Sequence, residues 1–176
     1  MSGLLEPVIT AEELARRTAQ LGAEISERYR GQDLLVVGVL KGAFMFLADL
    51  VRHISIPAHV DFVRVSSYGA DVKPGELKFV QDLDSPCKGR HVLVVEDIVD
   101  TGNSMSMLLA ELSQRGAASV RLCALIDKVE RRKTQVTVDF PGFRLAKGFL
   151  VGYGLDFAED YRCLPGVYEL IQQEGP

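Results

Sequence analysis

The sequence lacks the features that mark several large classes of protein. Its three cysteines, Cys87, Cys123 and Cys163, are far apart and form no CxxC pair, which fits a reducing compartment better than a disulfide framework. Its three histidines show no zinc-binding spacing. No apolar run approaches the ~18–20 residues that cross a bilayer, and the N-terminus has no apolar signal-peptide core. We therefore expect a cytoplasmic protein with no membrane partner.

The sequence also has fewer basic than acidic residues. The 176 residues include 20 Lys and Arg against 24 Asp and Glu, a formal net charge of −4. Nucleic-acid binding depends on clustered positive charge, so we expect no nucleic-acid partner. The hydrophobic share of 47% is ordinary for a globular protein. The length corresponds to about one domain of roughly 150 residues, and we predict a single domain over residues 1–176.

Apolar runs alternate with helical patterns along the chain. "DLLVVGVL" (33–40) is a continuous valine-rich run, typical of a strand buried on both faces of a parallel sheet, and "SVRLCALID" (119–127) is a mixed apolar strand. Thr10 and Glu13 form a capping-box pattern before a helix that we expect to end near Gly31. Further helices are expected in 43–54 and 104–115, and shorter strands in 59–69, 76–83, 149–157 and 166–171. This alternation predicts an α/β domain around a mostly parallel sheet.

The stretch "VLVVEDIVDTGNSM" (92–105) changes from apolar strand to acidic turn. Glu96, Asp97 and Asp100 are followed by Thr101, Gly102, Asn103 and Ser104 at the start of a helical pattern. Ligands of α/β sheets gather at the carboxyl ends of strands, and a tight turn before a helix offers amides and hydroxyls to an anion. A phosphate there would repel the first two acids, which suit sugar hydroxyls or Mg²⁺ instead. Together these groups indicate a phosphorylated ribose as ligand.

Other interpretations of this stretch fit less well. Asp-Thr-Gly also occurs in aspartic proteases, but those have all-β folds, and dehalogenase-type phosphotransferases need Asp-x-Asp-x-Thr. An acidic helix N-terminus can simply complement the helix dipole, at ~0.3–1 kcal/mol per charge. A single acid would fit that purely structural interpretation. Three acids, a glycine and two hydroxyl residues within the nine residues 96–104 fit it poorly.

The stretch 92–105 resembles the phosphoribosyl-pyrophosphate (PRPP) signature of type I phosphoribosyltransferases. The rest of the chain, from "VVGVLKGAFMFLADL" through "VDFVRVSSYG" to "KGFLVGYGLDFAEDYR", resembles the hypoxanthine-guanine branch of that family. The resemblance implies a mostly parallel central sheet flanked by helices, with a small hood formed by the N- and C-terminal segments. It implies purine salvage: transfer of 5-phosphoribosyl from PRPP to N9 of hypoxanthine or guanine, giving IMP or GMP and pyrophosphate. It also implies Mg²⁺ as cofactor and a homodimer or homotetramer.

The resemblance also implies a role for each matching residue. The 5′-phosphate would be held by the turn residues Asp100, Thr101, Gly102, Asn103 and Ser104. The ribose hydroxyls and their Mg²⁺ would be held by Glu96 and Asp97. The pyrophosphate would be bound by Lys41 and Gly42, where the Leu40–Lys41 peptide would be cis, by Arg162, and by Asp156 with a second Mg²⁺. A mobile flap at Ser67 and Tyr68 would close over the reaction, and Lys128, Phe149 and Leu150 would hold the purine.

Asp100 is our candidate for the general base. It precedes the phosphate-binding turn by one residue, so its carboxylate can accept a hydrogen bond from N7 of the purine as N9 attacks. The alternative is that it only caps the following helix.

Without the resemblance, several of these residues would be read as structural. Lys128 begins the charged run "DKVERRK", where a lysine is ordinarily solvated, and Phe149 alternates with apolar residues as a core position would. Asp156 could be a turn acid and Arg162 a surface base. Two other functions stay open at this point: a PRPP-binding regulator, for which the acidic chain offers no basic face, and a transferase for xanthine or a pyrimidine.

Overall fold

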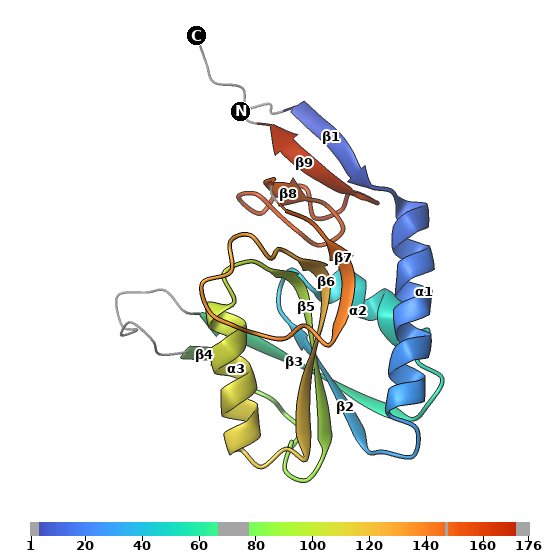
Figure 1. Ribbon diagram of the computed structural model, residues 1–176, viewed down its shortest axis with the longest axis vertical. Helices are drawn as coiled ribbons and strands as arrows, with labels where there is room; N and C mark the ends of the chain where they lie inside the picture. Colours follow the sequence, from blue (N-terminus) through green and yellow to red (C-terminus); the bar gives the residue numbers. More distant parts are fainter. Residues whose placement is uncertain (1–3, 67–77, 147, 172–176) are drawn as a thin grey trace.

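The computed structural model describes residues 4–66, 78–146 and 148–171 (Figure 1). Twelve elements follow one another in these ranges: β1 (Leu4–Ile9), α1 (Ala11–Arg28), β2 (Leu34–Val39), α2 (Phe44–Val51), β3 (Ala58–Ser66), β4 (Lys78–Gln81), β5 (His91–Val99), α3 (Asn103–Gln114), β6 (Ser119–Asp127), β7 (Phe140–Arg144), β8 (Leu150–Val151) and β9 (Val167–Ile171). None of the helices in the described ranges is long and apolar enough to cross a membrane.

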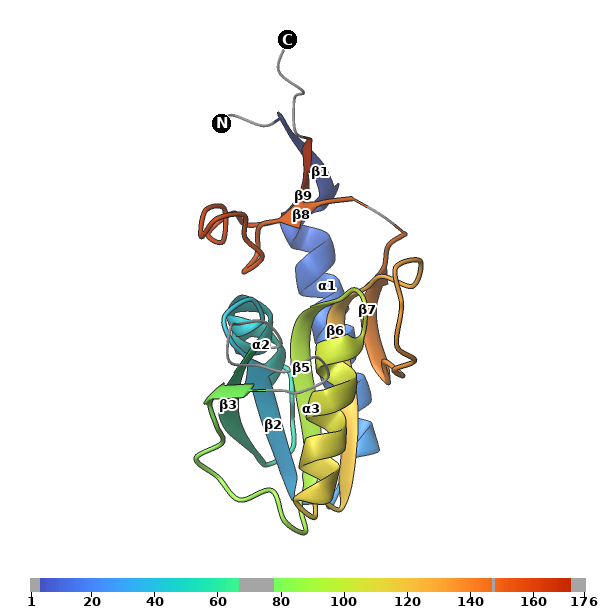
Figure 2. The same cartoon turned by 90° about the vertical axis from the view of Figure 1, so that its left-hand side faces the viewer.

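Two sheets organise these elements. The larger has the order β4-β3-β2-β5-β6-β7, with every neighbouring pair parallel except the antiparallel β3–β4 pair. The smaller is antiparallel, in the order β1-β9-β8, and joins the two ends of the chain. It lies beyond the carboxyl ends of the parallel strands and is the hood (Figures 1 and 2). The predicted fold class, a mostly parallel sheet with a hood of terminal segments, is confirmed.

The core consists of two layers, one on each face of the larger sheet. Because successive side chains of a strand point to opposite faces, Leu34 and Val36 of β2 pack with α1 and α2, whereas Leu35 and Val37 pack with α3. All four side chains are fully buried. This explains why the central strands read as continuous apolar runs without alternation.

The start of α1 agrees with the sequence pattern. The Thr10 hydroxyl accepts from the Glu13 amide at 3.2 Å, and the Glu13 carboxylate accepts from the Thr10 amide at 2.9 Å. The helix ends at Arg28, and Gly31 follows in a left-handed conformation with φ of 73°.

Two strands were not predicted from local pattern, and each has a physical reason. β1 contains Glu6 and Pro7 and is mostly exposed, so it has no apolar alternation. β7 contains Pro141 and Gly142, which ordinarily indicate a turn. Both are edge strands, where a proline is tolerated because one side of the strand forms no ladder. Their assignment therefore depends on the sheets they join.

Candidate active site

The parallel strands end on the side of the sheet that faces the hood (Figure 1). A cavity of about 320 Å³ opens there, where β5 leads into α3. Its lining includes six of the residues singled out from the sequence: Glu96, Asp97, Asp100, Thr101, Gly102 and Ser104. Asn103 lies beside them at the first position of α3, with an exposed side chain.

The turn between β5 and α3 depends on Gly102. This residue is the N-cap of α3 and is left-handed, with φ of 84° and no side-chain cap. A Cβ atom at this position would lie 2.5 Å from the Thr134 carbonyl oxygen, so a glycine is required both by conformation and by space. The first turn of a helix directs N–H groups outward without intrahelical partners, and here that turn borders the cavity. The arrangement suits an anion.

Glu96 and Asp97 are adjacent buried carboxyl groups, 8% and 9% exposed. The Asp97 amide donates to Glu96 Oε1 at 3.1 Å, and the Ile98 amide donates to Asp97 Oδ1 at 2.7 Å. Burial raises the pKa of Glu96 well above its usual value, and the neighbouring Asp97 carboxyl adds to the effect. A nearby cation would favour the charged form of the Glu96 carboxyl. This donor set therefore fits a hard cation or sugar hydroxyls.

The loop after β2 packs directly against Asp97. The Leu40–Lys41 peptide bond is cis, as predicted. A Cβ atom on Gly42 would lie only 1.6 Å from Asp97 Oδ2. The backbone of this loop therefore contacts the Asp97 carboxylate, and only glycine at position 42 leaves room for that contact. Two predicted parts of the site, 55 residues apart in sequence, are thus brought into contact.

Asp100 and Lys128 lie at the ends of neighbouring strands. Asp100 Oδ2 pairs with Arg131 Nη1 at 3.2 Å, and its Oδ1 is buried without a hydrogen-bond partner among the described residues. Lys128 is 4% exposed, and its Nζ donates to the Gly148 carbonyl oxygen at 2.5 Å. Burial lowers the pKa of the Lys128 ammonium, and the Asp100 carboxylate acts in the opposite direction. The interpretation of Lys128 as a solvated residue of a charged run is therefore wrong.

Phe149 and Leu150 begin the hood segment beside Lys128. Phe149 is 47% exposed, and its ring meets that of Phe157 edge to face, with centroids 5.4 Å apart at 87°. Leu150 is 7% exposed and pairs through its backbone with Glu169 of β9. The bond from Lys128 to Gly148 therefore brings the end of β6 next to an exposed aromatic face.

The basic residues expected at the pyrophosphate meet through a carboxylate that the sequence did not single out. Glu159 Oε2 lies 2.9 Å from Lys41 Nζ and 3.4 Å from Arg162 Nη2. Asp156 Oδ1 pairs with Arg162 Nη2 at 2.8 Å, and its Oδ2 accepts from the Glu159 amide at 2.9 Å. Nothing in the local sequence separates Glu159 from an ordinary surface acid.

Asp156 is the least direct fit to a metal-binding role, because both of its carboxylate oxygens already have protein partners. Across residues 4–66, 78–146 and 148–171, no three His, Cys, Asp or Glu side chains come together as a ligand set. Mg²⁺ is commonly held by one or two carboxylates together with substrate phosphates and water, and Glu96 with Asp97 meets that requirement. The flap residues Ser67 and Tyr68 lie outside the described residues.

The loop between β6 and β7 packs against the turn 100–104. Nothing in the sequence indicated this contact. The Lys133 and Thr134 amides donate to the Thr101 carbonyl oxygen at 2.9 and 3.0 Å. The Thr134 hydroxyl donates to Asn103 Oδ1 at 2.5 Å. The Asn103 side chain therefore supports this loop, and its contribution to a ligand would come from its backbone.

Comparisons with known proteins agree on one family. Residues 9–158 match the family model described as a phosphoribosyl transferase domain. Over 174 residues the chain is 42% identical to the hypoxanthine phosphoribosyltransferase of Salmonella typhimurium, covering 97% of this chain and 98% of that protein. It is 44% identical over 159 residues to the hypoxanthine-guanine phosphoribosyltransferase of Bacillus subtilis, covering 90% and 88%. A crystal structure of a hypoxanthine-guanine phosphoribosyltransferase from Bacillus anthracis superposes with a TM-score of 0.90 at 37% identity, covering 94% of this chain and 98% of that one.

Proposed function

Because the chain belongs to the hypoxanthine-guanine phosphoribosyltransferases of the phosphoribosyltransferase family, we propose a role for each part of its cavity in that reaction. The reaction transfers 5-phosphoribosyl from PRPP to N9 of hypoxanthine or guanine and releases pyrophosphate, giving IMP or GMP in purine salvage. The observation that supports this assignment most directly is the convergence of the turn 100–104, the paired acids Glu96 and Asp97, and the buried Lys128 on one edge of the sheet.

The 5′-phosphate binds at the turn 100–104. Its charge is met by amides of the turn and the first turn of α3, together with the Thr101 and Ser104 hydroxyls, as at other helix N-termini. Gly102 supports this role because its left-handed conformation directs the chain from strand to helix, and it has no side chain that would occupy the turn.

The ribose hydroxyls bind at Glu96 and Asp97, and these two carboxylates would also hold Mg²⁺. When bound, Mg²⁺ neutralises the charge of the departing pyrophosphate. The pyrophosphate itself lies against the Lys41–Gly42 loop and Arg162. Asp156 would hold a second Mg²⁺ only by giving up its contacts with Arg162 and the Glu159 amide. The cations of that site are already drawn together by Glu159.

The purine binds between Phe149 and the end of β6. Phe149 offers its exposed ring for stacking. The Lys128 ammonium donates to O6 of the base, and the backbone of Leu150 meets its edge. As the C1′–O bond to pyrophosphate breaks, the N9 lone pair forms the bond to C1′, and the N7 proton passes to Asp100. The Oδ1 of Asp100, which has no hydrogen-bond partner in the part of the chain that the structure describes, supports this role.

The whole assignment is tested by incubating the purified protein with PRPP, Mg²⁺ and each of five bases, and following nucleotide formation. Nucleotide should form with hypoxanthine or guanine. The family also leads us to propose a homodimer or homotetramer, which light scattering on the same preparation would distinguish.

Asp100→Asn is expected to lower kcat at least about tenfold while folding stays intact, because an amide cannot take up the N7 proton and general bases typically contribute ~10²–10⁴-fold. If Asp100 only capped α3, asparagine would serve about as well. Steady-state kinetics with hypoxanthine, together with thermal unfolding, separate the two outcomes.

Asp33→Asn is the matched control for this variant. Asp33 also pairs with an arginine, Arg90, at 2.8 Å, but at the opposite end of the sheet, and its loss should leave kcat unchanged. A near wild-type rate for Asp100→Asn would place the base elsewhere.

Gly42→Ala is expected to reduce kcat/KM for PRPP by roughly 10²-fold. The added methyl group would displace the Asp97 carboxylate, and a shift of about 1 Å in a positioning group can cost that much. Gly89→Ala is the control, because a Cβ atom there meets nothing within 4 Å, although its φ of 76° adds local strain. Equal kinetics for the two variants would contradict the contact between Gly42 and Asp97.

A further inference from the structure

We propose that Arg132 is a positioning residue that fixes the position of Asp100 relative to Lys128. Its guanidinium is anchored on the buried carboxylate of Asp127 and holds the main chain of the turn that carries Asp100. This inference rests on the proposed function of Asp100 and Lys128 and extends it to a residue that need not touch the substrate.

The guanidinium of Arg132 donates to main-chain oxygens of two separate segments, the end of β5 with the turn after it and the loop between β6 and β7. Its Nε donates to the Asp100 carbonyl oxygen at 3.2 Å, and its Nη2 donates to that of Val99 at 3.3 Å. Its Nη1 donates to the Val136 carbonyl oxygen at 2.9 Å. The side chain is only 13% exposed. One planar group thus ties the end of β5 to the loop between β6 and β7.

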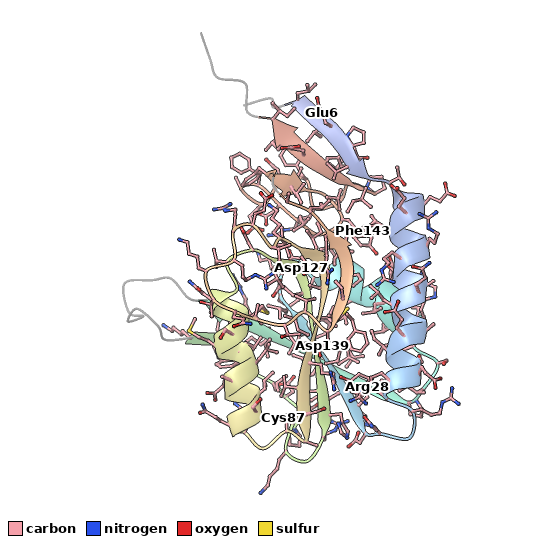
Figure 3. All side chains as sticks on the ribbon, viewed as in Figure 1. Glu6, Arg28, Cys87, Asp127, Asp139 and Phe143 are labelled. Carbon is pink, nitrogen blue, oxygen red and sulfur yellow. The ribbon has the colours of Figure 1, made fainter. Side chains whose placement is uncertain are left out.

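Asp127 fixes the direction of this guanidinium. It is the last residue of β6, labelled in Figure 3, and its side chain is 9% exposed. Arg132 Nη2 donates to Asp127 Oδ1, while the exposed Arg144 approaches Oδ2 at 3.8 Å. A buried ion pair resists rearrangement, because separating it leaves an uncompensated charge.

An arginine is needed at this position for geometric reasons. Its guanidinium carries five N–H donors in a rigid plane and can reach a carboxylate and several carbonyl oxygens at once. A lysine ammonium has three donors at a single point, so it can keep the charge pair with Asp127 but cannot span the same set of acceptors. Arg132→Lys therefore removes the positioning contacts while it retains the charge.

The contacts of Arg132 bear on the chemistry because of where Asp100 and Lys128 lie. The Lys128 amide donates to the Val99 carbonyl oxygen at 3.0 Å, the same oxygen that accepts from Arg132. O6 and N7 are adjacent on one edge of a 6-oxopurine, so the donor for O6 and the acceptor for N7 must be correctly spaced at the same moment. Arg132 sets that spacing by holding both strand ends.

The test compares Arg132→Lys with Arg144→Lys, which makes the same substitution at the other cation beside Asp127. Arg132→Lys is expected to lower kcat with hypoxanthine at least about tenfold, with kcat/KM falling in parallel, as for an interaction made in the transition state. Arg144→Lys is expected to stay within about twofold of wild type, since none of its described contacts reaches the turn.

A double variant separates positioning from a general structural role. If Arg132 acts through Asp100, adding Arg132→Lys to Asp100→Asn should cost no more than about a further twofold, because the group being positioned is already lost. Losses that multiply fully, or an Arg132→Lys variant within about twofold of wild type, would overturn the inference.

Thermal unfolding is measured for every variant, and assays are run well below each midpoint. Should Arg132→Lys not fold, Asp127→Asn replaces it in the same comparison, because it removes the carboxylate that anchors Arg132 and keeps the guanidinium. Its effect on kcat should again be non-additive with that of Asp100→Asn. Fully multiplicative losses in kcat would overturn the inference. A wild-type protein that forms no nucleotide would contradict the proposed function and this inference together. An active wild type with a fully active Arg132→Lys contradicts only the inference.

Discussion

Adenine is expected to be a substrate roughly 10⁴-fold or more poorer than hypoxanthine in kcat/KM. The Lys128 ammonium can donate hydrogen bonds but cannot accept them. In the proposed binding mode, hypoxanthine presents a carbonyl oxygen to it, whereas adenine presents an amino group that also donates. Sites built around one such hydrogen bond discriminate by ~10⁴–10⁵-fold, because the mismatched ligand leaves buried polar groups unpaired.

The position of Lys128 makes this discrimination strict. The residue is 4% exposed, and its Nζ is held by the Gly148 carbonyl oxygen at 2.5 Å. The Lys128 ammonium therefore has little freedom to turn away from the amino group of adenine, and there is little room for a water molecule between these two donors. Desolvation without a partner is the main cost of binding the wrong base.

Lys128→Gln tests the role of the ammonium directly. An amide side chain can both donate and accept, so the preference for hypoxanthine over adenine should collapse, mainly through a loss with hypoxanthine. Lys133→Gln, at an exposed position in the same charged run, should retain the wild-type preference. Similar kcat/KM values of the wild-type protein for the two bases would show that Lys128 has been misassigned.

Removal of divalent cations is expected to abolish transfer to within the detection limit. Pyrophosphate is a highly charged leaving group, and the two cations at its proposed site, Lys41 and Arg162, are both engaged by Glu159. Glu96 and Asp97 add negative charge at the proposed ribose site. Without Mg²⁺ the departing charge and the buried carboxylates would repel each other.

The measurement is the rate of nucleotide formation after exhaustive chelation with EDTA, followed by Mg²⁺ in excess over the chelator. Activity should disappear and then return. EDTA already saturated with Mg²⁺ is the control and should have no effect. Full activity in the chelated sample would mean that Glu96 and Asp97 serve only the sugar hydroxyls.

The local sequence was sufficient for the central strands and for the acidic turn. A strand buried on both faces reads as an apolar run, so β2, which is rich in valine, and β6, which is mixed apolar, could be recognised from composition. The turn 100–104 could be recognised because its glycine, hydroxyls and helix start are contiguous, and the anion site proposed there is built from neighbouring backbone. The edge strands β1 and β7 could not be recognised in this way, because their extended conformation depends on the strands with which they pair.

The residues of the proposed purine site were predicted from the family resemblance and not from their spacing in the sequence. Local pattern placed Lys128 in solvent and Phe149 in the core. The structure buries Lys128 and leaves Phe149 half exposed. Both reversals arise because the hood segment folds back over the end of β6, and a contact between residues 20 positions apart, as from Lys128 to Gly148, leaves no periodic signal.

The sequence by itself therefore determined the α/β class, the strand exit that carries the acids, and the type of ligand they suit. Only the tertiary structure decided which charged residues of "DKVERRK" are buried. Arg132 looks like its exposed neighbour Arg131 in sequence, yet its partners Val99 and Asp100 lie more than 30 residues away. Burying a charge is stable only where partners surround it, and those partners are assembled when β5 and β6 pair side by side.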